Sequence, residues 1–109
     1  TNGTRALHLS AAADEVLVGA FLNLSAMADR LRQLNQDVIV VCAGWKGKFC
    51  LEDTLFGGAL AAQLIDAFDT TSSDSTLAAL DLWHAARPDV AGYLLKSAHV
   101  RRLNSLEAH

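Results

Sequence analysis

The sequence predicts an α/β fold in which a parallel sheet, built from βαβ layers, carries flanking helices. Two short apolar runs, 15–21 and 38–41, are rich in valine and other β-favouring residues, as strands buried on both faces require. Between them lies a segment of helical periodicity, and this order with short loops predicts parallel neighbours joined by a right-handed crossover. Because two strands cannot form a stable open sheet, we expect a fragment of a larger α/β/α domain.

Composition is that of one globular region. The chain has 109 residues, of which 51% are hydrophobic and 19% charged, with a single proline. A formal net charge of -3 argues against a nucleic-acid partner. The apolar runs are too short to span a membrane, and the first residues do not resemble a signal peptide. We therefore treat residues 1–109 as a single α/β region of a longer domain and expect a cytoplasmic location.

Two cysteines, Cys42 and Cys50, flank a loop that contains glycine and lysine. We expect both to be reduced thiols of a cytoplasmic protein, and a disulfide between them is the alternative. These two cysteines alone would not make a metal site, because C-x2-C spacing is absent and the histidines are scattered.

The chain opens on the turn sequence Thr1-Asn2-Gly3-Thr4, which leads into a predicted helix over 5–13. Backbone N–H groups and hydroxyls at a helix start suit an anion, because the helix dipole also favours negative charge there. An ordinary turn is the simpler interpretation of the same residues.

The first predicted strand, 15–21, precedes a helix whose cap is marked by Asn23 and Ser25. Apolar residues recur on one face of this helix at i, i+4 and i+7, namely Met27, Leu31 and Leu34. Residues 35–37 then return the chain to the second strand.

The second predicted strand, 38–41, leads through the loop 43–50 into a helix that opens with Glu52 and Asp53. Ligands of open α/β sheets bind outside the carboxyl ends of the strands, so this joint is a candidate site. Acids in the first turn also stabilise a helix N-terminus by up to about 1 kcal/mol, which is the simpler reason for their presence. The alternative is that they hold Mg²⁺ and a phosphorylated substrate, because this ion prefers oxygen ligands.

Gly57 and Gly58 lie inside the same predicted helix, where together they cost roughly 1–2 kcal/mol relative to alanines. We expect them to permit close approach of a neighbouring element. The apolar stripe of this helix consists of Phe56, Leu60 and Leu64.

A further helix follows the polar loop 69–74. Ser73 or Asp74 can cap it, and Pro88 forces a break. His84 lies off its apolar stripe and is interpreted as a surface histidine. The stripe itself contains Ala79, Leu80, Trp83 and Ala86.

The last region is predicted as two short helical pieces, 89–96 and 97–103. The second carries a basic cluster near its start, formed by His99, Arg101 and Arg102. This cluster either binds an anion or pairs with surface acids.

Four motifs are distributed along the chain: Thr1-Asn2-Gly3-Thr4-Arg5-Ala6; Asn23-x-Ser25-Ala26; Cys42-Ala43-Gly44 with Lys48-Phe49-x-Leu51-Glu52-Asp53; and Ser97-x-His99-x-x-Arg102-Leu103. In order and spacing they resemble the 2-phosphosulfolactate phosphatase family. The resemblance spans nearly the whole chain and covers the middle and later parts of a longer family protein.

The resemblance implies a Mg²⁺-dependent phosphoric monoester hydrolase. Its reaction is the hydrolysis of 2-phospho-3-sulfolactate to 3-sulfolactate and phosphate, a step in coenzyme M biosynthesis, or of a related phosphoester. The implied catalytic residues are Glu52, Asp53 and Lys48: the two acids bind the metal or activate water, and the lysine neutralises substrate charge.

The implied substrate-binding residues lie at two other loops. Asn2, Gly3 and Thr4 would donate hydrogen bonds to a phosphate or sulfonate, and His99 and Arg102 would face the second anionic group. The expected partner is therefore a small anionic phosphoester, and a homo-oligomer is left open.

One position departs from the family pattern. The family usually has a serine where this chain has Cys50, so a weaker thiol replaces a hydroxyl cap. The departure lowers any expectation that position 50 donates to phosphate.

Two alternatives to the phosphatase remain open from the sequence. The first is a non-catalytic α/β module that binds a phosphorylated or sulfonated metabolite. The second is a structural fragment whose apolar faces dock on another half of the protein.

Overall fold

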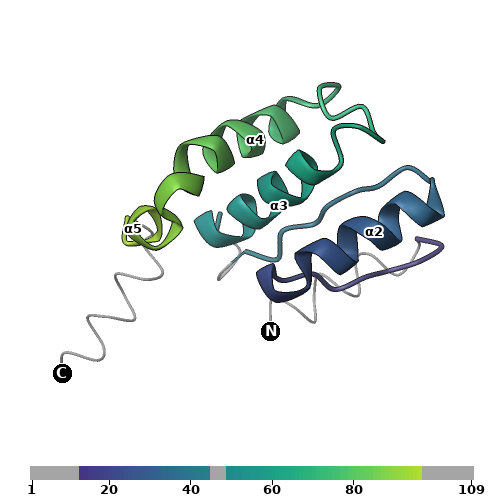
Figure 1. Ribbon diagram of the computed structural model, residues 1–109, viewed down its shortest axis with the longest axis horizontal. Coiled ribbons are helices and arrows are strands. Elements are labelled where there is room, and N and C mark those ends of the chain that lie inside the picture. Colours follow the sequence, from purple (N-terminus) through teal and green to yellow (C-terminus); the bar gives the residue numbers. More distant parts are fainter. Residues whose placement is uncertain (1–12, 45–48, 97–109) are drawn as a thin grey trace.

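The computed structural model describes residues 13–44 and 49–96. Within these ranges the chain forms four α-helices and two short 3-10 helices (Figure 1). They are η1 Phe21–Asn23, α2 Leu24–Leu34, α3 Leu51–Gln63, α4 Asp74–Ala86, η2 Arg87–Asp89 and α5 Val90–Leu94. None of these helices is long and apolar enough to cross a membrane.

The predicted α/β fold is wrong for the part of the chain that the structure describes. No strand, and hence no parallel sheet, occurs within residues 13–44 and 49–96. The predicted strands 15–21 and 38–41 are extended segments, except where η1 begins at Phe21. Every residue of these two runs is exposed, so the expectation of burial on both faces is wrong as well.

The physical reason is that valine-rich runs favour extended backbone locally, whereas a strand also needs ladder hydrogen bonds to a neighbour. Asn23 holds the end of the first segment instead. Its side-chain amide accepts from the Ala20 backbone N–H at 2.7 Å and donates to the Val18 carbonyl at 3.1 Å. The first segment is thus fixed to the start of α2 by a side chain and not by a sheet.

The four helices predicted in the described ranges are confirmed, the last of them, predicted over 89–96, as α5 Val90–Leu94. The helix α4 begins where expected, because Ser73 is its N-cap and accepts from the Thr76 backbone N–H at 3.4 Å. The break at Pro88 is also confirmed: α4 ends at Ala86 and the proline lies in η2. The predicted helix over 97–103 lies outside the described residues, as does the helix predicted over 5–13 except for Ala13.

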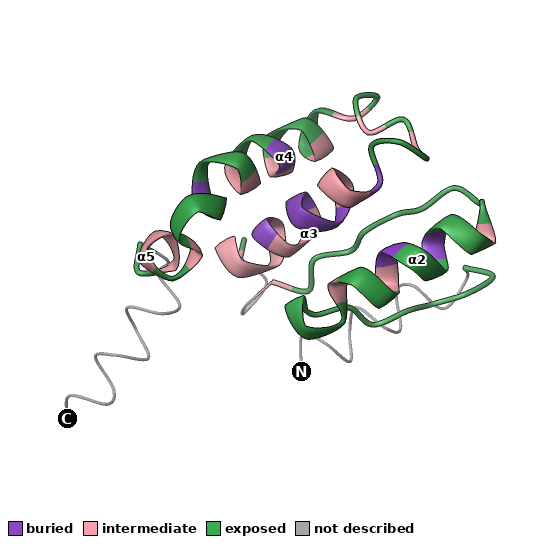
Figure 2. Ribbon diagram, in the orientation of Figure 1, coloured by how far each residue is buried: buried purple, intermediate pink, exposed green. Residues whose placement is uncertain are grey.

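The core is an interface between helices (Figure 2). The apolar stripes of α2 and α3 meet in one cluster, whose buried members are Ala28, Leu31, Leu60 and Leu64. Partly buried side chains pack around it, namely Leu24, Met27, Phe56 and Phe68. The helix α3 lies between α2 and α4 and makes its most extensive contacts with α4 (Figure 1).

The close approach that the glycine pair predicted is confirmed at Gly58. A Cβ atom there would lie 2.1 Å from the Ala79 carbonyl oxygen of α4 and 2.9 Å from the Trp83 Cβ. At Gly57 a Cβ would meet only Val40 Cγ1, at 3.7 Å. Gly58 therefore sets the spacing of α3 and α4, and Gly57 faces the second extended segment.

Arg32 joins the end of α2 to the end of α3. Its guanidinium donates to the Gln63 carbonyl, forms an ion pair with Asp29 at 3.0 Å and lies 3.8 Å from the Asp66 carboxylate. These side chains are partly exposed, so we assign the ion pairs little stability of their own. Their consequence is positional, because they fix the C-terminal ends of the two helices together.

Candidate functional site

The candidate site lies where the second extended segment meets the N-terminus of α3. Asp53 accepts a hydrogen bond from the Gly44 backbone N–H through Oδ2, at 2.8 Å. Gly44 has φ 74°, a left-handed conformation that glycine adopts without steric cost. The glycine thus turns its amide toward the carboxylate, and this bond closes the loop that contains Lys48.

Glu52 and Asp53 both lie in the first turn of α3, as predicted, and both are half-buried. Glu52 Oε2 accepts from the Cys50 thiol, with Sγ and Oε2 2.7 Å apart. Each acid therefore has one oxygen engaged with the loop that precedes the helix. This arrangement holds two carboxylates at a helix N-terminus, where the helix dipole stabilises their negative charge.

Cys50 is the N-cap residue of α3 and its side chain makes no capping hydrogen bond. This agrees with the expectation that a thiol is a poorer cap than a hydroxyl. Burial, followed by the hydrogen bond to Glu52, raises the pKa of the Cys50 thiol. The thiol is therefore protonated at neutral pH and acts here as a donor.

Cys42 lies on the other flank of the loop. Burial, with the charge of Asp53 as the second cause, raises the pKa of its thiol as well. Both cysteines are free, so the prediction of reduced thiols is confirmed and the alternative disulfide is not formed.

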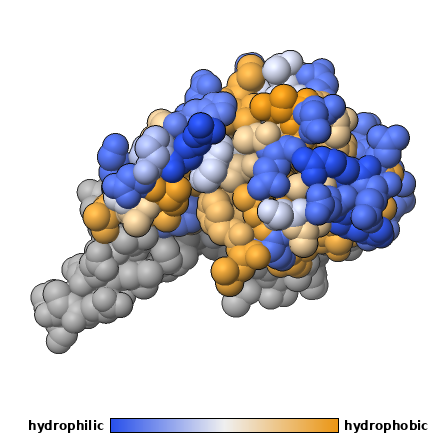
Figure 3. Space-filling view, in the orientation of Figure 1, coloured by the Kyte–Doolittle hydropathy of each residue, from blue (hydrophilic) through white to orange (hydrophobic). Residues whose placement is uncertain are grey.

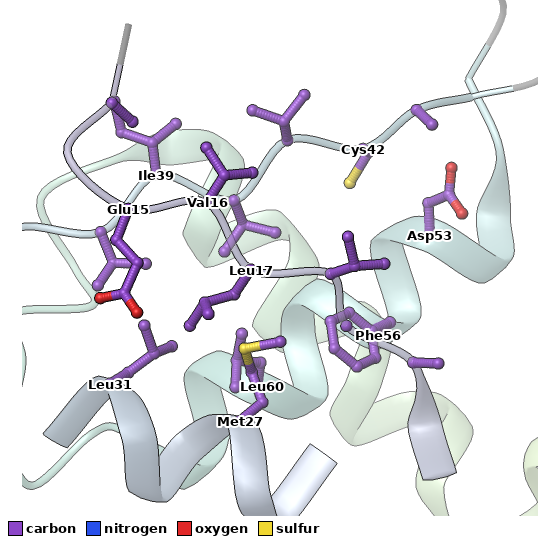
Figure 4. Close-up of a pocket in the computed structure, with 18 of the residues that line it drawn as sticks. Glu15, Val16, Leu17, Met27, Leu31, Ile39, Cys42, Asp53, Phe56 and Leu60 are labelled. Atoms are coloured by element: carbon purple, nitrogen blue, oxygen red, sulfur yellow. The ribbon is translucent and has the colours of Figure 1, made fainter. Parts of the chain in front are cut away.

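An open cavity of about 1010 Å³ adjoins this joint (Figure 4). The two extended segments line it together with side chains of α2 and α3, among them Met27, Leu31, Phe56 and Leu60. Figure 4 shows Glu15 and Asp53 on opposite sides of it. Among the described residues that line it are five acids and no lysine, arginine or histidine; the acids are Asp14, Glu15, Asp37, Glu52 and Asp53.

The two acids of the site are oxygen donors, the kind of ligand that Mg²⁺ prefers. This ion is commonly bound through one or two carboxylates, with water and substrate oxygens as the other ligands. Glu52 and Asp53 are donors of the right kind and number for that arrangement. Within residues 13–44 and 49–96, however, no group of three or more His, Cys, Asp or Glu side chains could enclose a metal ion.

Of the predicted site residues, the structure describes only these two acids. The other six lie outside the described residues, namely Asn2, Gly3, Thr4, Lys48, His99 and Arg102. The contact of Asp53 with Gly44 joins the two halves of one sequence motif. Sequence reasoning named both halves but missed the bond between them; a glycine that ends an extended run opposite a helix start is the signal that could have found it.

A family model, described as 2-phosphosulpholactate phosphatase, matches residues 1–109 of the chain. A protein of Caldanaerobacter subterraneus named "Probable 2-phosphosulfolactate phosphatase" is 39% identical over 106 residues, which cover 97% of this chain and 44% of that protein. A Synechococcus protein of the same name is 39% identical over 107 residues, with 97% and 44% covered.

A third relative of this name, from Clostridium kluyveri, is 30% identical over 109 residues, which cover 100% of this chain and 45% of the relative. The chain therefore spans less than half the length of these curated relatives. No solved structure matches the chain.

Proposed function

The chain belongs to the 2-phosphosulpholactate phosphatase family, and from this premise we propose that it forms part of a phosphatase that hydrolyses 2-phospho-3-sulfolactate to 3-sulfolactate and phosphate. The observation that carries the proposal is the family match over residues 1–109, and the names of the relatives supply the substrate. The position of Asp53 supports it, because a half-buried carboxylate is fixed beside a loop that holds Lys48.

Asp53 is the residue that we place at the reaction centre. Its Oδ2 is engaged by the Gly44 amide, which fixes the orientation of the carboxyl group, and we assign the reactive role to Oδ1. A carboxylate held in this way can orient or deprotonate a water molecule that attacks phosphorus. Glu52, one residue earlier, is held by the Cys50 thiol and is the second acid of the site.

We extend the proposal to Mg²⁺, which Glu52 and Asp53 would hold. When bound, the ion supplies positive charge to the phosphoryl oxygens. The residues of the chain add the remaining positive charge, from Lys48 in the same loop and from His99 and Arg102. This division is consistent with the two acids of the site, because Glu52 and Asp53 would repel a doubly anionic substrate unless cations accompanied it.

The biological setting completes the proposal. The reaction would serve coenzyme M biosynthesis, or a related pathway with another phosphoester, and would take place in the cytoplasm. Asn2, Gly3 and Thr4 are the proposed ligands of the phosphate or sulfonate.

The test uses a chimaera in which these 109 residues replace the aligned 106 residues of the Caldanaerobacter relative. We expect this chimaera and the relative itself to release phosphate from 2-phospho-3-sulfolactate with Mg²⁺, and to lose the activity in excess EDTA. Asp53→Asn should lower kcat at least about 100-fold, the usual scale for a general base. Asp81→Asn, the same change at an exposed position of α4, is the matched control and should leave kcat unchanged.

Three results would contradict the proposal. If neither protein released phosphate, the substrate would be wrong. If only the chimaera were inactive, although folded by circular dichroism, this chain would lack the family activity; saturable substrate binding without turnover would then favour the non-catalytic module. If Asp53→Asn and Asp81→Asn had equal kcat, Asp53 would have no catalytic role.

A further inference from the structure

The two extended segments, 15–20 and 37–44, present an unusually apolar surface to solvent. Seven large apolar side chains of these segments are exposed, namely Val16, Leu17, Val18, Val38, Ile39, Val40 and Val41. Ile39 is 88% exposed and Val18 is 70% exposed. Residues 15–20 and 37–43 are all exposed (Figure 2), and Figure 3 shows orange, hydrophobic side chains at the surface between hydrophilic ones.

These side chains are exposed together and not singly. They line the same open cavity of about 1010 Å³, and Figure 4 shows Val16 and Leu17 on one segment near Ile39 on the other. Scattered apolar residues are normal on a protein surface, whereas a contiguous apolar groove of this kind marks an interaction site. We call this surface, formed by residues 15–18 and 38–41, the apolar groove.

The chemistry of the apolar groove excludes the phosphatase substrate as its occupant. A small molecule with two anionic groups needs cations and hydrogen-bond donors, and the groove offers valine, leucine and isoleucine side chains. Acids lie at the start of each segment: Asp14 directly precedes the first, which begins with Glu15, and the second begins with Asp37. The ligand that fits is a polypeptide with an apolar face and with basic residues at its flank.

The lengths of the relatives indicate which polypeptide this is. The chain corresponds to 44% of the Caldanaerobacter relative and to 45% of the Clostridium relative, so each relative has more than half of its residues outside the matched stretch. A folded protein in water does not leave a groove of this kind uncovered when it has its own apolar segments to cover it.

We propose that the apolar groove is the docking surface for the part of the family polypeptide that lies outside these 109 residues. This remaining polypeptide buries residues 15–18 and 38–41 and thereby brings its own side chains next to Cys42 and Asp53 at the end of the groove. This inference rests on family membership and exposure and is independent of the proposed reaction. Its test is accordingly physical and measures no turnover.

Hydrogen–deuterium exchange measured by mass spectrometry compares the isolated 109-residue chain with the chimaera defined above. We expect the amides of 38–41 to exchange rapidly in the isolated chain and at least about 100-fold more slowly in the chimaera, because local burial there replaces exposure to solvent. The amides of α3 around Leu55 should be protected in both. Equal exchange at 38–41 in the two proteins would overturn the proposal.

A matched pair of variants localises the contact. Ile39→Asp in the chimaera should restore rapid exchange at 15–18 and 38–41, with α3 still protected. Ile65→Asp makes the same change at a 55% exposed isoleucine outside the groove and should not restore rapid exchange at 15–18 or 38–41. If Ile39→Asp also exposed α3, the milder Ile39→Ala would replace it. We would then expect a smaller increase in the amide exchange rate, confined to the groove.

Two further outcomes decide against the proposal. If Ile39 and Ile65 variants exchanged alike, the groove would not be the contact. If the isolated chain were protected at 38–41 and had twice its 11.6 kDa mass by light scattering, a second copy and not the remaining polypeptide would be the occupant.

Discussion

Gly58→Ala is expected to force α3 and α4 apart. The new Cβ would lie 2.1 Å from the Ala79 carbonyl oxygen and 2.7 Å from the Ala79 carbonyl carbon, whereas ordinary contact begins at 3.4 Å. The obstacle is backbone, which cannot rotate away as a side chain could. The two helices must therefore separate by more than 1 Å, and their interface is the most extensive contact between helices in the described residues.

The magnitude follows from two opposing terms. Alanine improves on glycine in a helix interior by about 1 kcal/mol. Overpacking of a buried interface costs typically about 1–3 kcal/mol, and a clash with backbone belongs at the upper end. We expect a net loss of about 1–2 kcal/mol in the free energy of unfolding.

Gly57→Ala is the matched control, since it makes the same change one position earlier in α3. Its Cβ would meet only Val40 Cγ1, at an ordinary 3.7 Å, so the helix-propensity gain of up to about 1 kcal/mol should remain. The assay is urea unfolding of both variants, followed by circular dichroism at equal protein concentration. If Gly58→Ala were as stable as Gly57→Ala, the close approach of α3 and α4 would be refuted.

Three further predictions concern the core, the loop and the thiols. Leu55→Ala should cost about 2–5 kcal/mol of unfolding free energy, because Leu55 is 0% exposed. Leu22→Ala, at a fully exposed leucine, is the control and should change the unfolding free energy by less than about 0.5 kcal/mol in the same urea assay. Gly44→Ala should cost about 1–2 kcal/mol because alanine is strained at φ 74°; an unchanged urea midpoint would show that the loop has another conformation. The pKa values of both thiols are raised above 9.0 in the folded state, so the stability that the protonated thiols contribute is present below pH 9 and is lost as the pH rises through the folded pKa. A chain with Cys42→Ala and Cys50→Ala should therefore lose less stability above pH 9 than the unchanged chain, as measured by alkaline melting scans.

The helices could be predicted from the sequence because their signals are local. The stripe of Leu60 and Leu64, the cap at Ser73 and the proline after α4 each act within a few residues of the element that they define. The position of Glu52 and Asp53 in the first turn of α3 followed from the same local reasoning. That part of the candidate site was therefore available from sequence.

The two apolar runs were not sufficient evidence for a sheet. The valines of 38–41 do give extended backbone, but pairing into a strand depends on a partner from elsewhere in the chain. The predicted burial also failed for this reason, because a run such as Val40-Val41 indicates a preference for burial and does not supply the element that buries it.

By itself, then, the sequence determined the helices, their ends and the acids at the start of α3, since periodicity, capping and the helix dipole are properties of neighbouring residues. Only the tertiary structure decided that Gly58 meets the backbone of Ala79, that the Gly44 amide holds Asp53, and that Ile39 faces solvent. Each of these depends on residues brought together from separate segments, and no local pattern specifies which segments meet.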